Sequence, residues 1–292
     1  PTRRSWVRVP LPAPTLIVLN IFMIVWIASY PKSGNTWVRA FLANYFSKKT
    51  TDVLNKTYGI KNFPREKMFE GIVDKKLIEK DQFELFKYFI AAQKKINENN
   101  KLNILKTHNF AGSMKDYPFT DSNNTCGVIY LIRDPRSVAV SYAYHGNISF
   151  EKSVDLLLNE ERIGINDKIY IEARLSWSIH AQSWINSKWP KVIIRYEDLH
   201  NDTFIYFKSI LSFLRKFIKF EIDEEKIKKT IEICSFKNLS EEEKRVGFKE
   251  QTGSVNFFRK GEIYEWKKTL PKNLIRKIEQ KLEKQMKELG YI

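Results

Sequence analysis

An apolar run, a short polar loop and an amphipathic pattern follow one another within residues 23–46, MIVWIASYPKSGNTWVRAFLANYF. The run is rich in Ile and Val, the loop spans residues 30–36, and Trp37, Phe41 and Tyr45 then recur every four residues. This order predicts a strand, a loop and a helix. Backbone N–H groups at a helix N-terminus lack intrahelical partners, and the helix dipole attracts anions there. The segment is therefore predicted to bind phosphate.

The residues of this loop suit an anionic ligand. Gly34 allows the backbone to approach closely, Lys32 adds a positive charge, and Ser33 and Thr36 add hydroxyl donors. The loop is not a Walker A motif, because no Gly lies five residues before Gly34 and because Lys32 precedes that glycine. A related but distinct phosphate loop is the better interpretation.

Composition limits the class of protein. A chain of 292 residues with 43% hydrophobic and 14% aromatic residues can bury a substantial core and is not disordered. Its formal net charge of +16 implies attraction to anions: a polyphosphorylated cofactor, an acidic acceptor, nucleic acid or a membrane face. The two cysteines and four histidines include no CxxC pair, so neither a disulfide scaffold nor a zinc site is predicted. A reducing, cytoplasmic setting is expected.

Residues 16–28, LIVLNIFMIVWIA, form an apolar segment that is too short for a predicted membrane span. Two arginines ahead of it give a superficial likeness to a signal peptide. The run leads directly into the phosphate loop, however, so a buried first strand is the simpler interpretation. The chain opens with Pro, and Met23 lies where that strand would begin. Residues 1–22 are therefore expected to be an N-terminal extension, native or not, and residues 23–292 a single domain.

Strand-like runs alternate with helical patterns along the chain, which predicts an α/β fold with a central, mainly parallel sheet flanked by helices. Strands are expected at 23–29, 102–106, 127–132 and 192–195, and helices at 76–95, 135–144, 167–187 and 271–289. Polar residues follow the later strands, including His108, Arg133 and Tyr196. Open parallel sheets bind ligands at this carboxyl edge, which is therefore the expected site.

Four segments, in order, resemble those of the sulfotransferases that use 3′-phosphoadenosine 5′-phosphosulfate (PAPS). YPKSGNTW (30–37) resembles their 5′-phosphosulfate loop, and LKTHNF (105–110) matches the place of their catalytic histidine. LIRDPRSVAVSYAYH (131–145) resembles their 3′-phosphate strand and helix, and FFRKGEIYEW (257–266) the late segment that closes over that phosphate. The resemblance covers nearly all of residues 23–290. It implies a P-loop-nucleotide-hydrolase-like sulfotransferase fold of the cytosolic, bacterial-like type.

The resemblance also implies what individual residues do. His108 would be the general base that takes the acceptor's proton, with His145 as a competing candidate, and His180 and His200 are expected to be structural. Lys32 would stabilise the leaving phosphate, and Lys106 would contact the transferring sulfuryl group. The catalytic set is therefore His108, Lys32, Lys106 and Ser141. The cofactor-binding set is Lys32, Ser33, Gly34, Asn35, Thr36, Trp37, Arg133, Ser141, Tyr196, Phe236, Arg259, Lys260 and Gly261.

Within that set, Trp37 and Phe236 would sandwich the adenine, and Tyr196 would contact its edge. The chain departs from the family pattern at several positions. Asn35 stands where many members have Thr, Cys234 replaces a common Thr, and Tyr264-Glu265 replaces a common Gly-Asp. The KxxxTVxxxE dimerisation pattern is absent after Trp266, so dimerisation is not inferred.

Two other functions are alternatives to sulfuryl transfer. A P-loop-type kinase acting on a small molecule or nucleoside would need ATP and magnesium, but the Walker A order is missing. A non-enzymatic basic module for nucleic acid or a membrane is the second alternative. No metal and no nucleic-acid partner are expected. The small-molecule acceptor is unidentified: a phenol, lipid, sugar, peptide or amine. Aromatic residues could line an apolar acceptor pocket, although core packing is expected for most: Tyr58, Phe63, Phe69, Tyr142, Tyr144 and Phe150.

Overall fold

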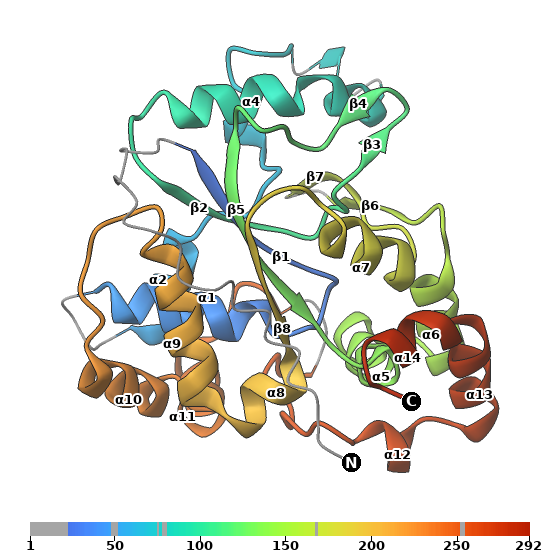
Figure 1. The fold of residues 1–292 in the computed structure, drawn as a ribbon. Coiled ribbons are helices and arrows are strands. Elements are labelled where there is room, and N and C mark those ends of the chain that lie inside the picture. The colour runs from blue at the N-terminus through green and yellow to red at the C-terminus, as the bar shows by residue number, and fades with distance from the viewer. Residues whose placement is uncertain (1–22, 48–51, 75, 78–80, 167–168, 252–254) are drawn as a thin grey trace.

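The computed structural model describes residues 23–47, 52–74, 76–77, 81–166, 169–251 and 255–292. The predicted extension, residues 1–22, lies outside these ranges. Four parallel strands form the central sheet in the order β2-β1-β5-β8 (Figure 1). They are β1 (Ile24–Ser29), β2 (Asn103–Thr107), β5 (Thr125–Ile132) and β8 (Lys191–Arg195). The predicted α/β architecture with a parallel sheet flanked by helices is confirmed.

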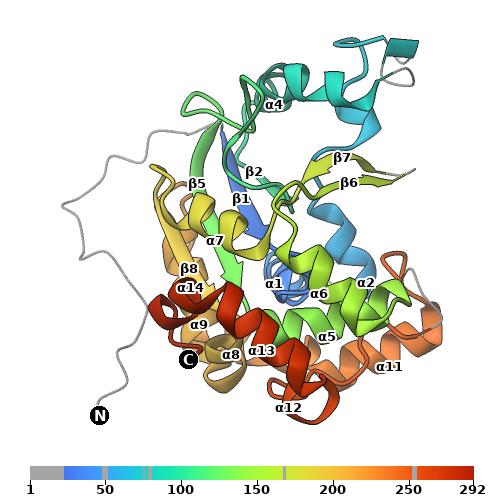
Figure 2. The ribbon, with the colours of Figure 1, turned by 90° about the vertical axis from the view of Figure 1, so that its right-hand side faces the viewer.

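Helices cover both faces of the sheet because successive side chains of a strand point to opposite sides. Val25 and Ile27 face one core with α1 (Asn35–Tyr45), α9 (Thr203–Leu214) and α10 (Glu224–Ile233). Ile24 and Trp26 face the other core. The helices that pack there are α4 (Phe89–Asn97), α5 (Pro135–Gly146), α6 (Phe150–Leu158), α7 (Trp177–Ile185), α13 (Lys272–Lys281) and α14 (Glu283–Glu288). In Figure 2, α13 lies along α5 and α6.

The remaining elements are short and surround the carboxyl edge or the sheet's flanks. Helical ones are α2 (Val53–Lys56), η1 (Thr57–Gly59), η2 (Glu66–Met68), η3 (Gln82–Tyr88), α8 (Tyr196–Asn201), α11 (Phe236–Val246) and α12 (Trp266–Thr269). Two antiparallel hairpins pair β3 (Ser113–Met114) with β4 (Tyr117–Pro118) and β6 (Ile163–Asn166) with β7 (Ile169–Ala173). No helix within the described ranges is long and apolar enough to cross a bilayer.

Three of the predicted helices differ from the structure. The helix expected at 167–187 is wrong in its first part, because β7 pairs with β6 there. Helix α7 begins only after Ser176, whose hydroxyl accepts a hydrogen bond from the Ile179 N–H. The one expected at 76–95 is divided, since Asp81 caps η3 and α4 follows. The last, 271–289, is interrupted at Leu282 between α13 and α14. Its apolar stripe is nevertheless buried as predicted, at Leu274, Ile278, Leu282 and Met286.

Candidate active site

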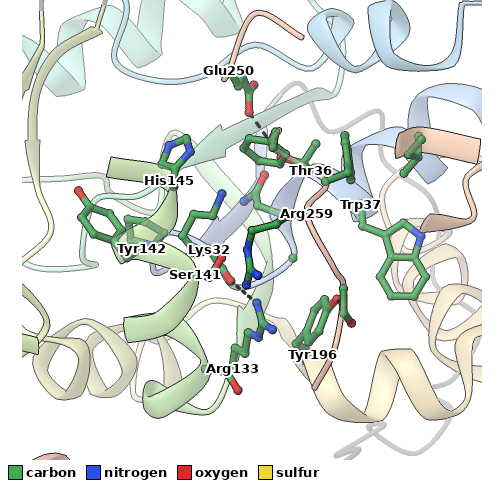
Figure 3. Close-up of a pocket in the computed structure, with 18 of the residues that line it drawn as sticks. Lys32, Thr36, Trp37, Arg133, Ser141, Tyr142, His145, Tyr196, Glu250 and Arg259 are labelled. Carbon is green, nitrogen blue, oxygen red and sulfur yellow. Dashed lines mark hydrogen bonds between the residues drawn. The ribbon is translucent and has the colours of Figure 1, made fainter. Parts of the chain in front are cut away.

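A cavity of about 1310 Å³ opens at the carboxyl edge of the sheet. Its walls come from the segments after β1, β2, β5 and β8, from the start of α11 and from the chain around residues 257–265. Every predicted site residue except Ser33 lines it: Lys32, Gly34, Asn35, Thr36, Trp37, Lys106, His108, Arg133, Ser141, Tyr196, Phe236, Arg259, Lys260 and Gly261. Several of these side chains gather around one space in Figure 3. Segments that are distant in sequence therefore meet where the strand pattern predicts.

The phosphate loop has the backbone that its glycine requires. Gly34 has φ +96°, and a Cβ placed on it would lie 2.7 Å from the ring carbon Cδ2 of Tyr196. Lys32 also has a positive φ, of 68°. Ser33 is buried, and its hydroxyl has no hydrogen-bond partner among the described residues. A buried, unpaired hydroxyl beside a helix N-terminus fits a site for an oxyanion.

Asn35 supports the loop from behind. Its amide nitrogen donates to the Ile27 carbonyl at 3.0 Å and to the Ser29 hydroxyl at 3.2 Å. Its amide oxygen accepts from Arg39 Nε at 3.0 Å. Because both ends of the amide are used inside the protein, the side chain holds the loop's shape. Its part in binding the cofactor stays a prediction.

Two lysines, Lys32 (half-buried) and Lys106 (buried), contribute positive charge to the cavity. Burial and the neighbouring Arg133 lower the pKa of Lys32 to about 7, and its ammonium lies 3.8 Å from the centre of the Phe257 ring. Burial also lowers the pKa of Lys106 to about 8, although Glu250 opposes the shift. An anion bound between these lysines would restore their protonated state, since an opposite charge favours the charged form.

His108 follows β2 and has a fixed ring orientation. Its Nδ1 lies 2.7 Å from the Ser29 carbonyl oxygen, so this nitrogen carries the proton and donates. The other nitrogen, Nε2, is then the acceptor. Burial, Lys106 and Arg174 place the pKa of His108 well below its usual value. The imidazole is therefore neutral near pH 7 and can accept a proton from a hydroxyl.

The other histidines differ in position. His145 lines the cavity beside Tyr142 and Phe257, and burial with the charges of Lys32 and Lys106 lowers its pKa to about 3. His180 is fully buried, and its Nδ1 lies 3.0 Å from the Tyr130 hydroxyl, in keeping with a structural role. His200, also expected to be structural, lines the cavity beside Trp37.

A second cationic region adjoins the phosphate loop. Arg133 donates to the Lys32 carbonyl at 3.1 Å and to the Glu262 carbonyl at 3.2 Å, and its guanidinium lies 4.3 Å from the centre of the Tyr196 ring. Its Nε is buried and unpaired within the part of the chain that the structure describes. Arg133 thus links the phosphate loop to the late closing segment.

The closing segment carries the remaining predicted cations. Arg259 stacks on Tyr144 at 3.9 Å and forms an ion pair with Glu265, which Lys260 also approaches at 3.3 Å. Gly261 has φ +71°, and a Cβ there would lie 2.7 Å from Cδ2 of Phe236. Glu265, one of the departures from the family pattern, therefore orients both cations.

Glu250 is the main site residue that sequence reasoning missed. Its two carboxylate oxygens accept from Arg39 Nη2 at 2.9 and 2.8 Å, and one of them also accepts from the Thr36 hydroxyl at 3.4 Å (Figure 3). The Lys106 ammonium lies 3.7 Å away. Burial alone would raise the pKa of Glu250, but the charges of Lys106 and Arg39 lower this pKa to about 2. No local pattern marks this residue, because Arg39 is 211 positions earlier in the chain.

The cavity suits a ligand with two anionic ends and a flat ring. Among the residues that line it, Arg133 has an unpaired buried donor, and the indole N–H of Trp37 is also unpaired within the described ranges. Trp37 and Phe236 line the same wall. Cys234 is fully buried outside this lining. Within the described ranges, no group of three or more His, Cys, Asp or Glu side chains is arranged to hold a metal ion.

Comparison with curated proteins points to one family. The sequence is 27% identical to cytosolic sulfotransferase 8 of Arabidopsis thaliana over 277 residues, which cover 90% of this chain and 77% of that protein. It is 24% identical to flavonol 3-sulfotransferase of Flaveria bidentis over 278 residues, covering 92% and 83% of the two chains.

Solved structures share the fold. A mouse sulfotransferase, SULT7A1, complexed with PAP matches with a TM-score of 0.60 and 19% identity, covering 91% of this chain and 85% of that one. A retinol dehydratase in complex with androsterone and the inactive cofactor PAP matches with a TM-score of 0.57 and 16% identity, covering 92% and 82%. The family model for the sulfotransferase domain matches residues 24–290. The chain therefore belongs to the sulfotransferase family.

Proposed function

We propose that this enzyme transfers the sulfuryl group of PAPS to a hydroxyl or amine of a small-molecule acceptor. One observation carries the proposal: two cationic regions, around Lys32 with Lys106 and around Arg133 with Arg259, line the same cavity as a neutral, oriented His108. PAPS carries its 5′-phosphosulfate and its 3′-phosphate at two positions of the ribose, and these two anionic groups match the two cationic regions. The acceptor would enter on the His108 side.

PAPS supplies an SO3 unit whose bond to the 5′-phosphate oxygen breaks as the acceptor oxygen bonds to sulfur. Nε2 of His108 takes the proton that the acceptor hydroxyl loses, while Nδ1 stays bonded to the Ser29 carbonyl. This bond holds the ring in one orientation, so the accepting nitrogen does not change during the reaction. A general base of this kind contributes about 10²–10⁴-fold to the rate.

Lys32 and Lys106 stabilise the charge that develops during transfer. Lys32, which lines the cavity, would neutralise the leaving phosphate oxygen together with the backbone N–H groups of residues 33–36. Lys106 of β2, two residues before His108, would hold the sulfuryl oxygens. Such fixed donors cost little reorganisation when charge appears, which is why they lower the barrier.

The second cationic region and the aromatic side chains near it would bind the second phosphate and the base. Arg133, Arg259 and Lys260 offer charge-assisted hydrogen bonds, and Ser141 of α5 offers a hydroxyl. Trp37 and Phe236 would hold the adenine between their rings, with Tyr196 at its edge. The several relatives named as cytosolic sulfotransferases support our further inference that this enzyme works in the cytoplasm.

The direct test is a transfer assay with PAPS labelled in its sulfuryl sulfur, run against acceptors of each chemical class. We expect label on at least one acceptor and its loss in Lys32→Met. Lys267→Met is the matched control, because Lys267 is exposed and outside the cavity lining. Absence of transfer to every class, together with phosphate transfer from ATP–magnesium, would contradict the proposal.

A further inference from the structure

The hairpin β6–β7 and helix α5 wall the cavity next to His108. The Phe110 N–H donates to the Ala173 carbonyl at 2.8 Å, and the Ala173 N–H donates to Asn109 Oδ1 at 2.9 Å, so the end of β7 is fixed beside the histidine. Arg174 follows β7 and lines the cavity. Figure 3 shows Tyr142 of α5 on the side of Lys32 opposite Trp37. Tyr142 and Arg174 therefore lie at the acceptor's end of the cavity.

Two guanidinium groups flank Tyr142 at this end. Arg174 donates from Nη1 to the Tyr142 hydroxyl at 3.4 Å, while Nε and Nη2 both donate to Glu172 Oε2, at 2.9 and 2.6 Å. The Arg162 guanidinium lies 4.5 Å from the centre of the Tyr142 ring. Its Nη1 donates to the Tyr30 hydroxyl at 2.8 Å and approaches the Leu156 carbonyl at 3.4 Å.

The charges around Tyr142 do not cancel. Arg162 is only 6% exposed and Glu172 only 1%. Among the described residues, Glu172 pairs with Arg174, and no carboxylate pairs with Arg162. One positive charge is therefore left over in a poorly solvated place, where an uncompensated charge is unfavourable. Lys106, which is assigned to the sulfuryl group, also interacts electrostatically with Glu172 and Arg174, so this region adjoins the cations expected to bind the cofactor.

The hydrogen-bonding groups here are donors. Because the Tyr142 oxygen accepts from Arg174, its own proton is free to point toward a ligand oxygen. The Nη1 edge of Arg174 is the edge that Glu172 does not engage. A hydroxyl proton beside a guanidinium edge is a suitable partner for a carboxylate or a similar anion.

We propose that the acceptor carries an anionic group, a carboxylate in the simplest case, and that Arg174 and Tyr142 bind this group while the acceptor hydroxyl reaches His108. This inference rests on the proposed sulfuryl transfer and narrows its substrate class. A neutral acceptor of the same shape leaves these donors without a charged partner, and a cationic acceptor adds repulsion.

The test compares three phenols that share the reacting hydroxyl and differ in the charge of one substituent. They are para-hydroxyphenylacetate, which is anionic, its neutral amide, and tyramine, which is cationic. We expect kcat/KM with PAPS to be about tenfold or more higher for the acid than for the amide, and lowest for tyramine. An equal or higher value for the amide or tyramine overturns the proposal.

Variants separate local binding from the general attraction of anions to a basic protein. The double variant Glu172→Gln/Arg174→Gln leaves the net charge unchanged and replaces the ion pair by two amides, and Tyr142→Phe keeps the ring and removes the hydroxyl. We expect the acid-to-amide ratio to fall several-fold in both. Arg245→Gln lowers the net charge outside the cavity lining and is expected to keep the ratio. A ratio that changes only in Arg245→Gln contradicts local recognition.

Binding measurements keep this inference distinct from the proposed function. Calorimetry with adenosine 3′,5′-bisphosphate verifies that each variant is folded and has an intact cofactor end. If no phenol is sulfated, the affinities of the acid and the amide are compared on enzyme saturated with the bisphosphate, and equal affinities overturn the inference. Failure of the wild-type enzyme to bind the bisphosphate overturns the proposed function itself, and this inference with it.

Discussion

At the residue scale, the proposed chemistry depends on which groups are neutral and which are charged near pH 7. Burial and neighbouring cations keep His108 and His145 neutral, and they bring the pKa values of Lys32 and Lys106 close to the working pH. Of the two histidines, His108 has an Nδ1 held by a backbone carbonyl. This fixed orientation is the physical reason for assigning it the role of base.

Replacing His108 by alanine tests that role. We expect His108→Ala to keep its affinity for the bisphosphate and to lose about 10²–10⁴-fold in kcat, because only proton removal is affected. His145→Ala is the matched comparison, since His145 lines the same cavity, and it should lose much less. A sulfate-transfer assay measures the turnover of both variants. A wild-type rate in His108→Ala, or a loss in His145→Ala equal to that in His108→Ala, rules out His108 as the base.

The pH dependence of kcat/KM tests the role of Glu250. A lysine whose pKa is lowered is charged below that pKa, so activity should fall as pH rises through about 7 and 8, where Lys32 and Lys106 lose their protons. Charged groups from several elements act on Lys106: Glu250, Arg39, Glu172 and Arg174. Glu250→Gln removes the carboxylate that opposes the shift, so the alkaline limb should move to lower pH.

Glu242→Gln is the control for that experiment. Glu242 is also a buried carboxylate and accepts from the Leu54 backbone N–H, but it lies outside the cavity lining. It should change stability without moving the alkaline limb. An unshifted limb in Glu250→Gln, with activity otherwise reduced, would mean that Glu250 only supports the fold.

At the scale of elements, the site is a set of loops held at the ends of parallel strands. The strand, loop and helix at 24–45 were predictable because the apolar run, the small residues and the helical spacing are all local signals. The hairpin β6–β7 was not predictable in this way, because the local pattern of this segment also suits a helix. Its strand conformation depends on the antiparallel pairing of β7 with β6. The sequence therefore predicted residues of the proposed cofactor site, but it did not predict Glu172 and Arg174 of the proposed acceptor site.

Gly34→Ala tests the shape of the phosphate loop. Alanine at φ +96° costs about 1–2 kcal/mol, and its Cβ would lie 2.7 Å from Tyr196. We expect lower stability and a marked loss of bisphosphate affinity. Gly59→Ala is the control, because a Cβ there meets nothing within 4 Å and no positive φ is involved. Bisphosphate binding that is unchanged in Gly34→Ala would show that the loop does not hold the ligand.

Arg259→Ala tests the closing segment. Removing charged hydrogen bonds to the second phosphate should weaken bisphosphate binding by about 1.5–3 kcal/mol. The exposed Arg245 lies outside the cavity lining, so Arg245→Ala, with the same change in net charge, should leave the affinity nearly unchanged. Calorimetric dissociation constants give the answer, and equal values for Arg259→Ala and the wild type would remove Arg259 from the site.

At the scale of the whole molecule, the cavity depends on contacts between distant parts of the chain. Arg133 bonds both to the loop after β1 and to the Glu262 carbonyl, 129 residues later. Glu250 reaches back to Arg39 and Thr36 in the same way. Such long-range pairs carry no local sequence signal. Composition therefore predicted an attraction to anions, but it did not predict which carboxylates pair with the cations.

The central claim is that these distant segments together form a site for a nucleotide with phosphates at both the 3′ and 5′ positions. Isothermal titration of the wild-type protein with adenosine 3′,5′-bisphosphate, and separately with ATP–magnesium, tests it most directly. The account predicts saturable binding of the bisphosphate that is much tighter than that of ATP–magnesium. No detectable bisphosphate binding, with tight binding of ATP–magnesium instead, would contradict it.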